Sequence, residues 1–271
     1  MRSHPLSSLS VIVVAGLAAA SGGPIGCSTL TESAANLLIS PADEVALGVE
    51  LAGQVEQELV IHPDPDVQAF MQAMGNEIVA VLPADIPAEY NFQFHVVDDD
   101  ETINAFAAPG GQIYFYTGLL LAAENQAEVM GVLGHEIAHV TERHGAEQLV
   151  TQFGIESVLG LALGNSSGDL LGTVASLATT GALLKYSRDH ESEADEVGLR
   201  YVINAGYDPY AFVGFFERLE AMQGVRLPDF LSTHPDPGDR AARIRQLIPT
   251  YGDVPTFTGD EVVWAEFLAR L

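Results

Sequence analysis

The chain has 271 residues, of which 48% are hydrophobic, enough to bury a sizeable core and to exclude wholesale disorder. It carries 37 acidic residues against 11 basic ones, which gives a formal net charge of -26 at pH 7. A charge of this sign repels phosphate backbones, so we expect no nucleic-acid partner. We interpret the acidity as a solvated surface without a catalytic role.

The first residues have the composition of an export signal. An apolar run over residues 11–20 follows an early arginine, and it fits the ~7 to 15 residues of a signal-peptide core but not the ~20 of a membrane span. The residues before Cys27 resemble a bacterial lipobox, and Ser28 after it is typical of outer-membrane lipoproteins. We therefore expect residues 1–26 to be a signal peptide, Cys27 to be acylated, and residues 27–40 to be a lipidated tether. An ordinary signal peptide without a lipid is the alternative.

Residues 41–271 are expected to form one domain. Ser40 as N-cap and Pro41 at the first helical position predict the start of a helix. A second helical pattern covers residues 66–82, and the alternating YNFQFHVVD of residues 90–98 predicts a strand by its period of two.

Residues 104–120, NAFAAPGGQIYFYTGLL, predict a hairpin, because Pro-Gly-Gly separates two short β-prone runs. The hairpin either completes the core or leaves an open sheet edge, with which an extended peptide could pair by main-chain hydrogen bonds. In the second interpretation the substrate-binding residues are Asn104, Ala105, Phe106, Gly110 and Gly111.

The stretch LGHEIAHVTERHG, residues 133–145, belongs to a helix that Asn125 is predicted to cap. His135 and His139 are four residues apart and project from one face, so two imidazoles can reach one Zn²⁺ at distances of about 2.0 to 2.1 Å. Glu136 is displaced by about 100° around the helix. It therefore flanks the metal without binding it, which is the position of a general base for metal-activated water.

A catalytic zinc usually takes three protein ligands. The metzincin pattern needs a histidine six residues after the second motif histidine, where Gly145 stands, so that class is excluded. We assign His144 to the C-terminal end of the helix. In an acidic helix expected to begin after Ser187, Glu191 and Asp195 share one face. We therefore predict Glu191 as the third ligand and Asp195 as an acceptor that orients a ligating histidine.

Three ordered motifs, NAFAAPGGQIYFYTGLL, HEIAH and SRDHESEAD, resemble those of the HtpX and CAAX-prenyl-protease-like zinc metallopeptidases, which are gluzincins. The resemblance covers most of residues 41–250, and the last motif matches the family's Ser-Arg-x-x-Glu-x-x-Ala-Asp. It implies an α+β fold, a mostly helical zincin-like domain with a small antiparallel sheet or hairpin beside the active-site helix. It also implies one Zn²⁺ per chain, with His135, His139 and Glu191 as ligands, Glu136 as catalytic base and Asp195 in support.

The family includes bacterial envelope lipoproteins, some with tetratricopeptide repeats that need about 34 residues each. Too few residues follow position 249 for such a repeat. The resemblance implies an endopeptidase on the periplasmic side of the outer membrane that degrades misfolded or stalled envelope proteins in extended form. The alternatives are a soluble periplasmic or secreted location and, for function, a chaperone or assembly factor for outer-membrane proteins that uses the same groove without proteolysis.

In lipoprotein members of the family a histidine in a His-Pro loop can approach the zinc. We therefore expect His234 either to occupy the place of the water, which makes the enzyme latent, or to stabilise the oxyanion. Arg240 is interpreted as a helix-surface residue. Trp264, in a short C-terminal helix, is interpreted as a residue that packs in the core. The apolar region 153–184 is interrupted by NSSGD and glycines, so we expect packed helices with a turn at 165–168 rather than a membrane span.

Overall fold

The computed structural model of the chain describes residues 38–164, 172–174, 176, 186–222, 234 and 237–271. The expected signal peptide, the lipidated cysteine and most of the tether lie outside these residues and stay predictions. So does the turn expected at 165–168.

Two helices open the domain close to where the sequence predicts them. Helix α2 (Pro41–Glu58) is capped by Ser40, whose backbone N–H donates to the Asp43 carboxylate at 2.9 Å while its hydroxyl accepts from the Asp43 backbone N–H at 3.2 Å. Helix α3 (Pro65–Val79) ends three residues earlier than predicted. The backbone there tightens into turns with i to i-3 hydrogen bonds that end the helix.

The sheet has three described strands, β1 (Gln93–Val97), β2 (Ala105–Ala108) and β3 (Gln112–Tyr116), in the order β1-β3-β2. Strands β2 and β3 form the predicted antiparallel hairpin around the short helix η1 (Pro109–Gly111). Strand β1, however, pairs with β3 in parallel. The sheet is therefore mixed rather than wholly antiparallel, because the chain leaves β1, crosses to the far edge for β2 and returns through the hairpin into the middle position.

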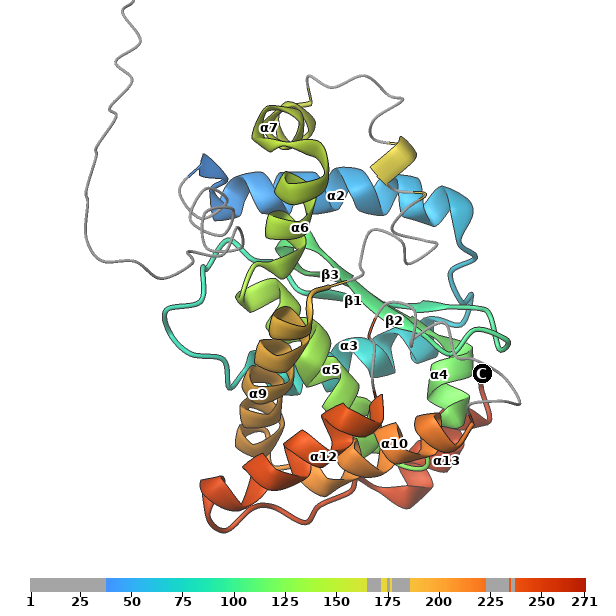
Figure 1. Ribbon diagram of the computed structural model, residues 1–271. Helices are drawn as coiled ribbons and strands as arrows, with labels where there is room; N and C mark the ends of the chain where they lie inside the picture. Colours follow the sequence, from blue (N-terminus) through green and yellow to red (C-terminus); the bar gives the residue numbers. More distant parts are fainter. Residues whose placement is uncertain (1–37, 165–171, 175, 177–185, 223–233, 235–236) are drawn as a thin grey trace, which may run out of the picture.

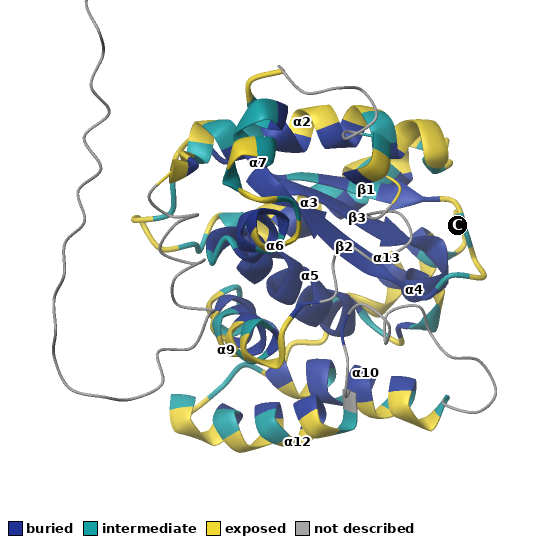
Figure 2. Cartoon of the chain, turned by 45° about the horizontal axis from the view of Figure 1, so that its top comes forward, coloured by how far each residue is buried: buried dark blue, intermediate teal, exposed yellow. Residues whose placement is uncertain are grey.

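The sheet separates two apolar clusters. Alternate residues of β3 point to opposite faces, so Ile113 and Phe115 join one cluster while Tyr114 and Tyr116 join the other. Helix α2 contributes to the second cluster, and it lies across one face of the sheet, with α3 and α5 across the other (Figure 1). The strands and α5 are almost entirely buried (Figure 2).

The other helices are α4 (Thr117–Ala122), α5 (Gln126–Thr141), α6 (His144–Phe153), α7 (Ile155–Ala162), α9 (Arg188–Asn204), α10 (Pro209–Ala221), α12 (Pro237–Leu247), η2 (Ile248–Tyr251) and α13 (Glu261–Leu268). Helices α3, α6, α9 and α10 all contact α5, which carries the histidine motif. Among the described residues, no helix has both the length and the apolar character needed to cross a membrane. Trp264 in α13 is buried and stacks on Phe267, as predicted for a core residue.

Helices α5 and α9 cross closely where each carries a glycine. A methyl group on Gly134 would meet the backbone of Gly198, and one on Gly198 would meet the backbone of Gly134. This contact brings the helix of His135 against the helix of Glu191, so two small residues set the distance on which the site depends.

Candidate metal centre

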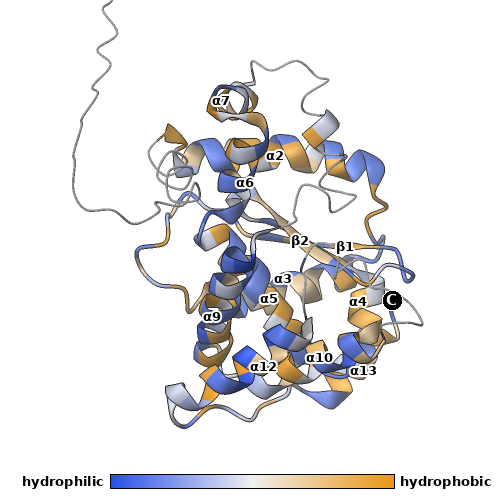
Figure 3. Ribbon diagram, viewed as in Figure 1, coloured by the Kyte–Doolittle hydropathy of each residue, from blue (hydrophilic) through white to orange (hydrophobic). Residues whose placement is uncertain are grey.

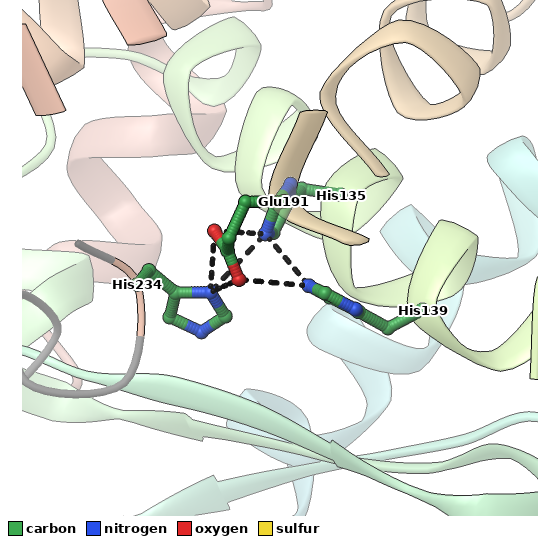
Figure 4. A group of neighbouring side chains, drawn as sticks. All are labelled: His135, His139, Glu191 and His234. Carbon is green, nitrogen blue, oxygen red and sulfur yellow. Dashed lines mark hydrogen bonds and ion pairs between the residues drawn. The ribbon is translucent and has the colours of Figure 1, made fainter. Parts of the chain in front are cut away.

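Four buried side chains from three segments converge on one point (Figure 4). Helix α5 supplies His135 and His139, α9 supplies Glu191, and His234 comes from just before α12. Their four candidate ligand atoms all lie within 4.8 Å of one another. The structure therefore brings together both predicted histidines, the predicted glutamate and the loop histidine.

The spacing of these atoms fits a tetrahedral zinc ion. Nε2 of His135 lies 3.0 Å from Nε2 of His139, 3.2 Å from Nδ1 of His234 and 3.6 Å from Oε2 of Glu191. Oε1 of Glu191 lies 3.5 Å from Nε2 of His139 and 3.1 Å from Nδ1 of His234. Ligands at about 2.0 to 2.1 Å from a tetrahedral Zn²⁺ are about 3.3 to 3.4 Å apart, so nitrogen and oxygen donors of the right type already stand near the required positions.

Burial keeps the two motif histidines in the form that binds metal. It lowers the pKa of His135 to about 4 and the pKa of His139 to about 3, so both rings are neutral at pH 7. Burial alone would raise the pKa of Glu191, but the positive charges of His234 and Arg240 outweigh it and hold that pKa well below its ordinary value. The third candidate ligand is therefore an anion at neutral pH.

Glu136 is wholly buried beside the cluster. Its carboxylate faces Nε2 of His234, 3.4 Å from Oε1, and the backbone amide of Ala107 in β2, and neither oxygen accepts a hydrogen bond of normal geometry from the described residues. Burial raises the pKa of Glu136 to about 7. A carboxylate with such a pKa both takes up and releases a proton near neutral pH, as a general base requires.

Asp195 and Arg240 support the cluster from behind. The Asp195 carboxylate accepts from Nδ1–H of His135 at 3.1 Å, so the lone pair of that ring is on Nε2, which faces the metal position. Arg240 was predicted to lie on the surface of its helix, and this is wrong. It is only 5% exposed, and it donates to Asp195 at 2.6 Å and pairs with Glu191 at 2.9 Å. A cation such as Arg240 is expected at the surface because of its charge. Here its contacts with two buried carboxylates stabilise it in the interior.

The upper part of α9, which supplies Glu191, is strongly hydrophilic (Figure 3). Within it, Glu191 and Asp195 are buried toward α5, whereas Glu193 is exposed. The helical spacing of these acids therefore predicted correctly that Glu191 and Asp195 share a face and that Glu193 does not.

His144 was predicted at the C-terminal end of the active-site helix, and this is also wrong. Helix α5 ends at Thr141, and His144 is the first residue of α6. The ring is 2% exposed, and its Nδ1 lies 2.9 Å from Nδ1 of His139. Tyr186, which sequence reasoning passed over, stacks on His139 with a ring separation of 4.0 Å.

The predicted substrate-binding residues lie in and around the hairpin. Asn104, Ala105 and Phe106 are buried beside or within β2, which is an edge strand of the described sheet and contacts α5. Gly110 and Gly111 have φ of 75° and 108°, and they pack against backbone atoms of α2 and of Asn91. The two glycines thus have a structural reason to be there, and the substrate role of all five residues stays a prediction.

Two histidines on one buried helix, a glutamate on a crossing helix and a buried glutamate within the histidine motif define a metal-dependent peptidase site. The sequence profile of Peptidase family M48 matches residues 60–248, and the chain belongs to this family of metalloendopeptidases. The resemblance inferred from the three motifs is thereby confirmed.

Named relatives agree with the family. The chain is 26% identical over 245 residues to the "Beta-barrel assembly-enhancing protease" of Yersinia pestis, covering 86% of this chain and 50% of that protein. It is 28% identical over 224 residues to the protein of the same name in Escherichia coli (strain K12), covering 79% and 45%. It is 34% identical over 165 residues to the "Mitochondrial metalloendopeptidase OMA1" of Schizosaccharomyces pombe, covering 60% and 48%. The chain spans about half the length of these relatives.

Proposed function

We propose that the chain is a zinc-dependent endopeptidase of the bacterial cell envelope that degrades misfolded or stalled envelope proteins. The single observation that supports it best is the buried convergence of His135, His139 and Glu191 beside the catalytic candidate Glu136. The names of two relatives, which refer to β-barrel assembly, support the envelope setting.

The chemistry follows from the positions of the side chains. Zn²⁺, when held by His135, His139 and Glu191, supplies Lewis acidity that polarises a carbonyl and lowers the pKa of water to about 7. Glu136 accepts the proton of the attacking water at a carboxylate oxygen and returns it to the leaving nitrogen. Asp195 holds His135 in the correct tautomer throughout.

An extended polypeptide is the substrate form that the sheet edge supports. Strand β2 lies at that edge, and the backbone of Ala107 lies beside Glu136. A peptide paired with β2 would therefore pass the base with a scissile bond near it. All four residues of β2 are buried, so such pairing requires the edge to open.

Replacement of Glu136 by glutamine tests the proposal. Glu136→Gln keeps the size of the side chain but removes the base, so we expect loss of casein cleavage with zinc content retained. Glu142→Gln, one residue beyond the end of α5, is the matched control and should cleave at the wild-type rate. The competing function, a chaperone or assembly factor that binds without cleaving, is favoured instead if the wild type cleaves no protein tested yet prevents aggregation, and if Glu136→Gln does so equally well.

His234 lies where a fourth zinc ligand would lie. Its Nδ1 is 3.2 Å from Nε2 of His135 and 3.1 Å from Oε1 of Glu191, close to the separation of about 3.3 to 3.4 Å between ligand atoms of a tetrahedral zinc. This position supports the latent arrangement, in which the histidine occupies the place of the water, over oxyanion stabilisation. His234→Ala should then cleave casein faster than the wild type. Slower cleavage by His234→Ala would favour the oxyanion role.

The envelope location rests on the export signal and the lipobox. Acylation of Cys27 would anchor the chain on the periplasmic side of the outer membrane. Mass spectrometry of the mature N-terminus tests this: a chain that begins at a lipidated Cys27 supports the anchor, and a chain that begins elsewhere favours a soluble periplasmic or secreted protein.

A further inference from the structure

Behind the proposed zinc ligand His139 lies a second buried histidine that the peptidase mechanism does not use. Nδ1 of His144 is 2.9 Å from Nδ1 of His139, on the side of the His139 ring away from the metal position. We propose that His144 is a positioning residue that selects the tautomer and fixes the ring plane of His139, so that Nε2 of His139 offers its lone pair to the metal. The inference deepens the proposed metal centre and rests on it.

The hydrogen positions follow from the ligand geometry. A neutral imidazole that binds metal through Nε2 carries its proton on Nδ1. Nδ1–H of His139 must then donate to Nδ1 of His144, since only one proton fits between two nitrogens at 2.9 Å. His144 is therefore an acceptor at Nδ1, and its own proton lies on Nε2.

The next contact has the polarity that this assignment needs. Nε2 of His144 lies 3.4 Å from Oε2 of Glu193, a carboxylate that can only accept when ionised. The chain of donors thus runs in one direction, from His139 to His144 to Glu193. It parallels the contact between Asp195 and the other motif histidine, His135, so each ring has its own acceptor.

Stacked rings hold the pair in place. Tyr186 covers one face of His139, and His190 lies parallel to His144 with ring centroids 4.4 Å apart. Nε2 of His190 is itself bonded to Glu147 at 3.2 Å. The orientation of His144 is therefore defined by packing as well as by its hydrogen bonds.

A strained turn returns His144 toward the helix that precedes it. Among the described residues, Arg143 is the only non-glycine residue with a left-handed φ, 64°. Its guanidinium donates to the buried Glu44 carboxylate at 2.8 Å and to the carbonyl oxygen of Ile39. Such strain persists only where surrounding contacts impose it, and here they come from Glu44 in α2 and from Ile39 just before that helix.

Zinc affinity is the measurement that tests the role of His144. All variants carry Glu136→Gln, which prevents self-cleavage, and zinc binding is measured by competition with a chromophoric chelator. His144→Ala removes the acceptor and should weaken zinc binding by about 10- to 100-fold, the usual loss when such an outer partner is removed. His144→Asn places an amide oxygen near the former Nδ1 and should bind zinc close to the parent.

Two further variants separate positioning from a general loss of packing. His144→Gln has the same amide as asparagine, but its longer chain places the oxygen near the former Nε2, so it should bind zinc as weakly as alanine. His62→Ala removes another buried histidine, 7% exposed, whose Nδ1 accepts from the backbone of Asp64, and should leave zinc binding unchanged. The visible spectrum of the Co²⁺-loaded protein should match the parent in His144→Asn and differ from it in His144→Gln.

Equal zinc affinity in the parent, His144→Ala and His144→Gln would overturn the inference, and so would an asparagine variant as weak as the alanine variant. If His144→Ala does not fold without metal, the comparison of asparagine with glutamine decides alone. If the parent binds zinc but the wild type, which keeps Glu136, cleaves nothing, the proposed function is refuted. The comparison of zinc affinities still tests the role of His144 in that case.

Discussion

Replacement of Arg240 by methionine should destabilise the metal-free protein severely. Arg240 is 5% exposed, and it donates to the Asp195 carboxylate at 2.6 Å and pairs with Glu191 at 2.9 Å. Its guanidinium also lies over the ring of Phe216, 4.3 Å from the ring centre. Methionine preserves much of the volume but leaves two buried carboxylates without this partner.

The expected cost is about 3 to 5 kcal/mol, the range for removing one member of a buried ion pair. Of that total, about 0.5 to 2 kcal/mol comes from the lost contact between the guanidinium and the Phe216 ring. Domains of this kind have a total stability of about 5 to 15 kcal/mol, so the substitution consumes a large share of it. A surface arginine, as the sequence suggested, would change stability by only about 0.5 kcal/mol.

Urea unfolding of chelator-treated protein in the Glu136→Gln background measures this cost, with m-values compared to check that unfolding stays two-state. Arg245→Met on the same helix is the control. It is 53% exposed and pairs with Glu217 at 2.7 Å, and we expect no measurable change. A loss below about 1 kcal/mol in Arg240→Met would refute the argument from buried charge. Addition of Asp195→Asn should recover part of the loss, because it removes one of the two negative charges that Arg240 balances, although Arg243 also pairs with Asp195 at 2.6 Å.

Three further predictions concern other parts of the molecule. Removal of zinc by a chelator should abolish cleavage and lower the melting temperature, because a ligand at about 100 times its Kd adds about 2.7 kcal/mol of stability; an unchanged melting temperature would speak against a bound metal. Gly134→Ala should cost about 1 to 3 kcal/mol in urea unfolding, since the added methyl meets α9, whereas Gly53→Ala, which meets nothing within 4 Å, should be neutral or stabilising. Burial raises the pKa of Glu44 above its ordinary value of 4.5, so its contribution to stability is full below the unfolded-state pKa and is lost as pH rises through the folded-state pKa. The stability of the wild type relative to Glu44→Gln should therefore fall as pH rises above 4.5, and a rise would contradict this assignment.

The ligands were predictable because their signals are local. His135 and His139 need only helical spacing to share a face, and Glu191 and Asp195 are separated from Glu193 by the same rule. The caps that define these helices, such as Ser187 for α9, are also local, since its hydroxyl accepts from a backbone amide three residues later.

Two other partners of the ligands, His144 and Arg240, were not predictable, because their positions depend on contacts between distant segments. His144 reaches His139 only because Arg143 adopts a left-handed conformation held by Glu44, which is 99 residues away. Arg240 is buried because Asp195, 45 residues earlier, lies next to it. Neither contact can be recognised from the periodicity of the sequence. An arginine on an amphipathic helix occupies the same kind of position in the sequence pattern whether it faces solvent or a buried carboxylate.

The pairing of β1 escaped prediction for a related reason. Its alternation of apolar residues predicts a half-buried strand but not the neighbour with which it pairs. The hairpin turn determines how β2 meets β3, whereas the parallel pairing of β1 with β3 depends on the crossover between β1 and β2.

The effect of Arg240→Met should also depend on the metal, because a divalent cation beside Glu191 supplies some of the positive charge that the substitution removes. The loss of stability should therefore be smaller in the zinc-loaded protein than in the metal-free protein. By linkage, the folded variant would then bind zinc at least as tightly as the parent, since it no longer holds a second cation against the same carboxylate. The opposing effect is positional, since Arg240 also holds Glu191 at 2.9 Å and Asp195 at 2.6 Å. A stability gap that widens on zinc addition, with weaker zinc binding, would mean that Arg240 acts mainly by holding these carboxylates in place rather than by its charge.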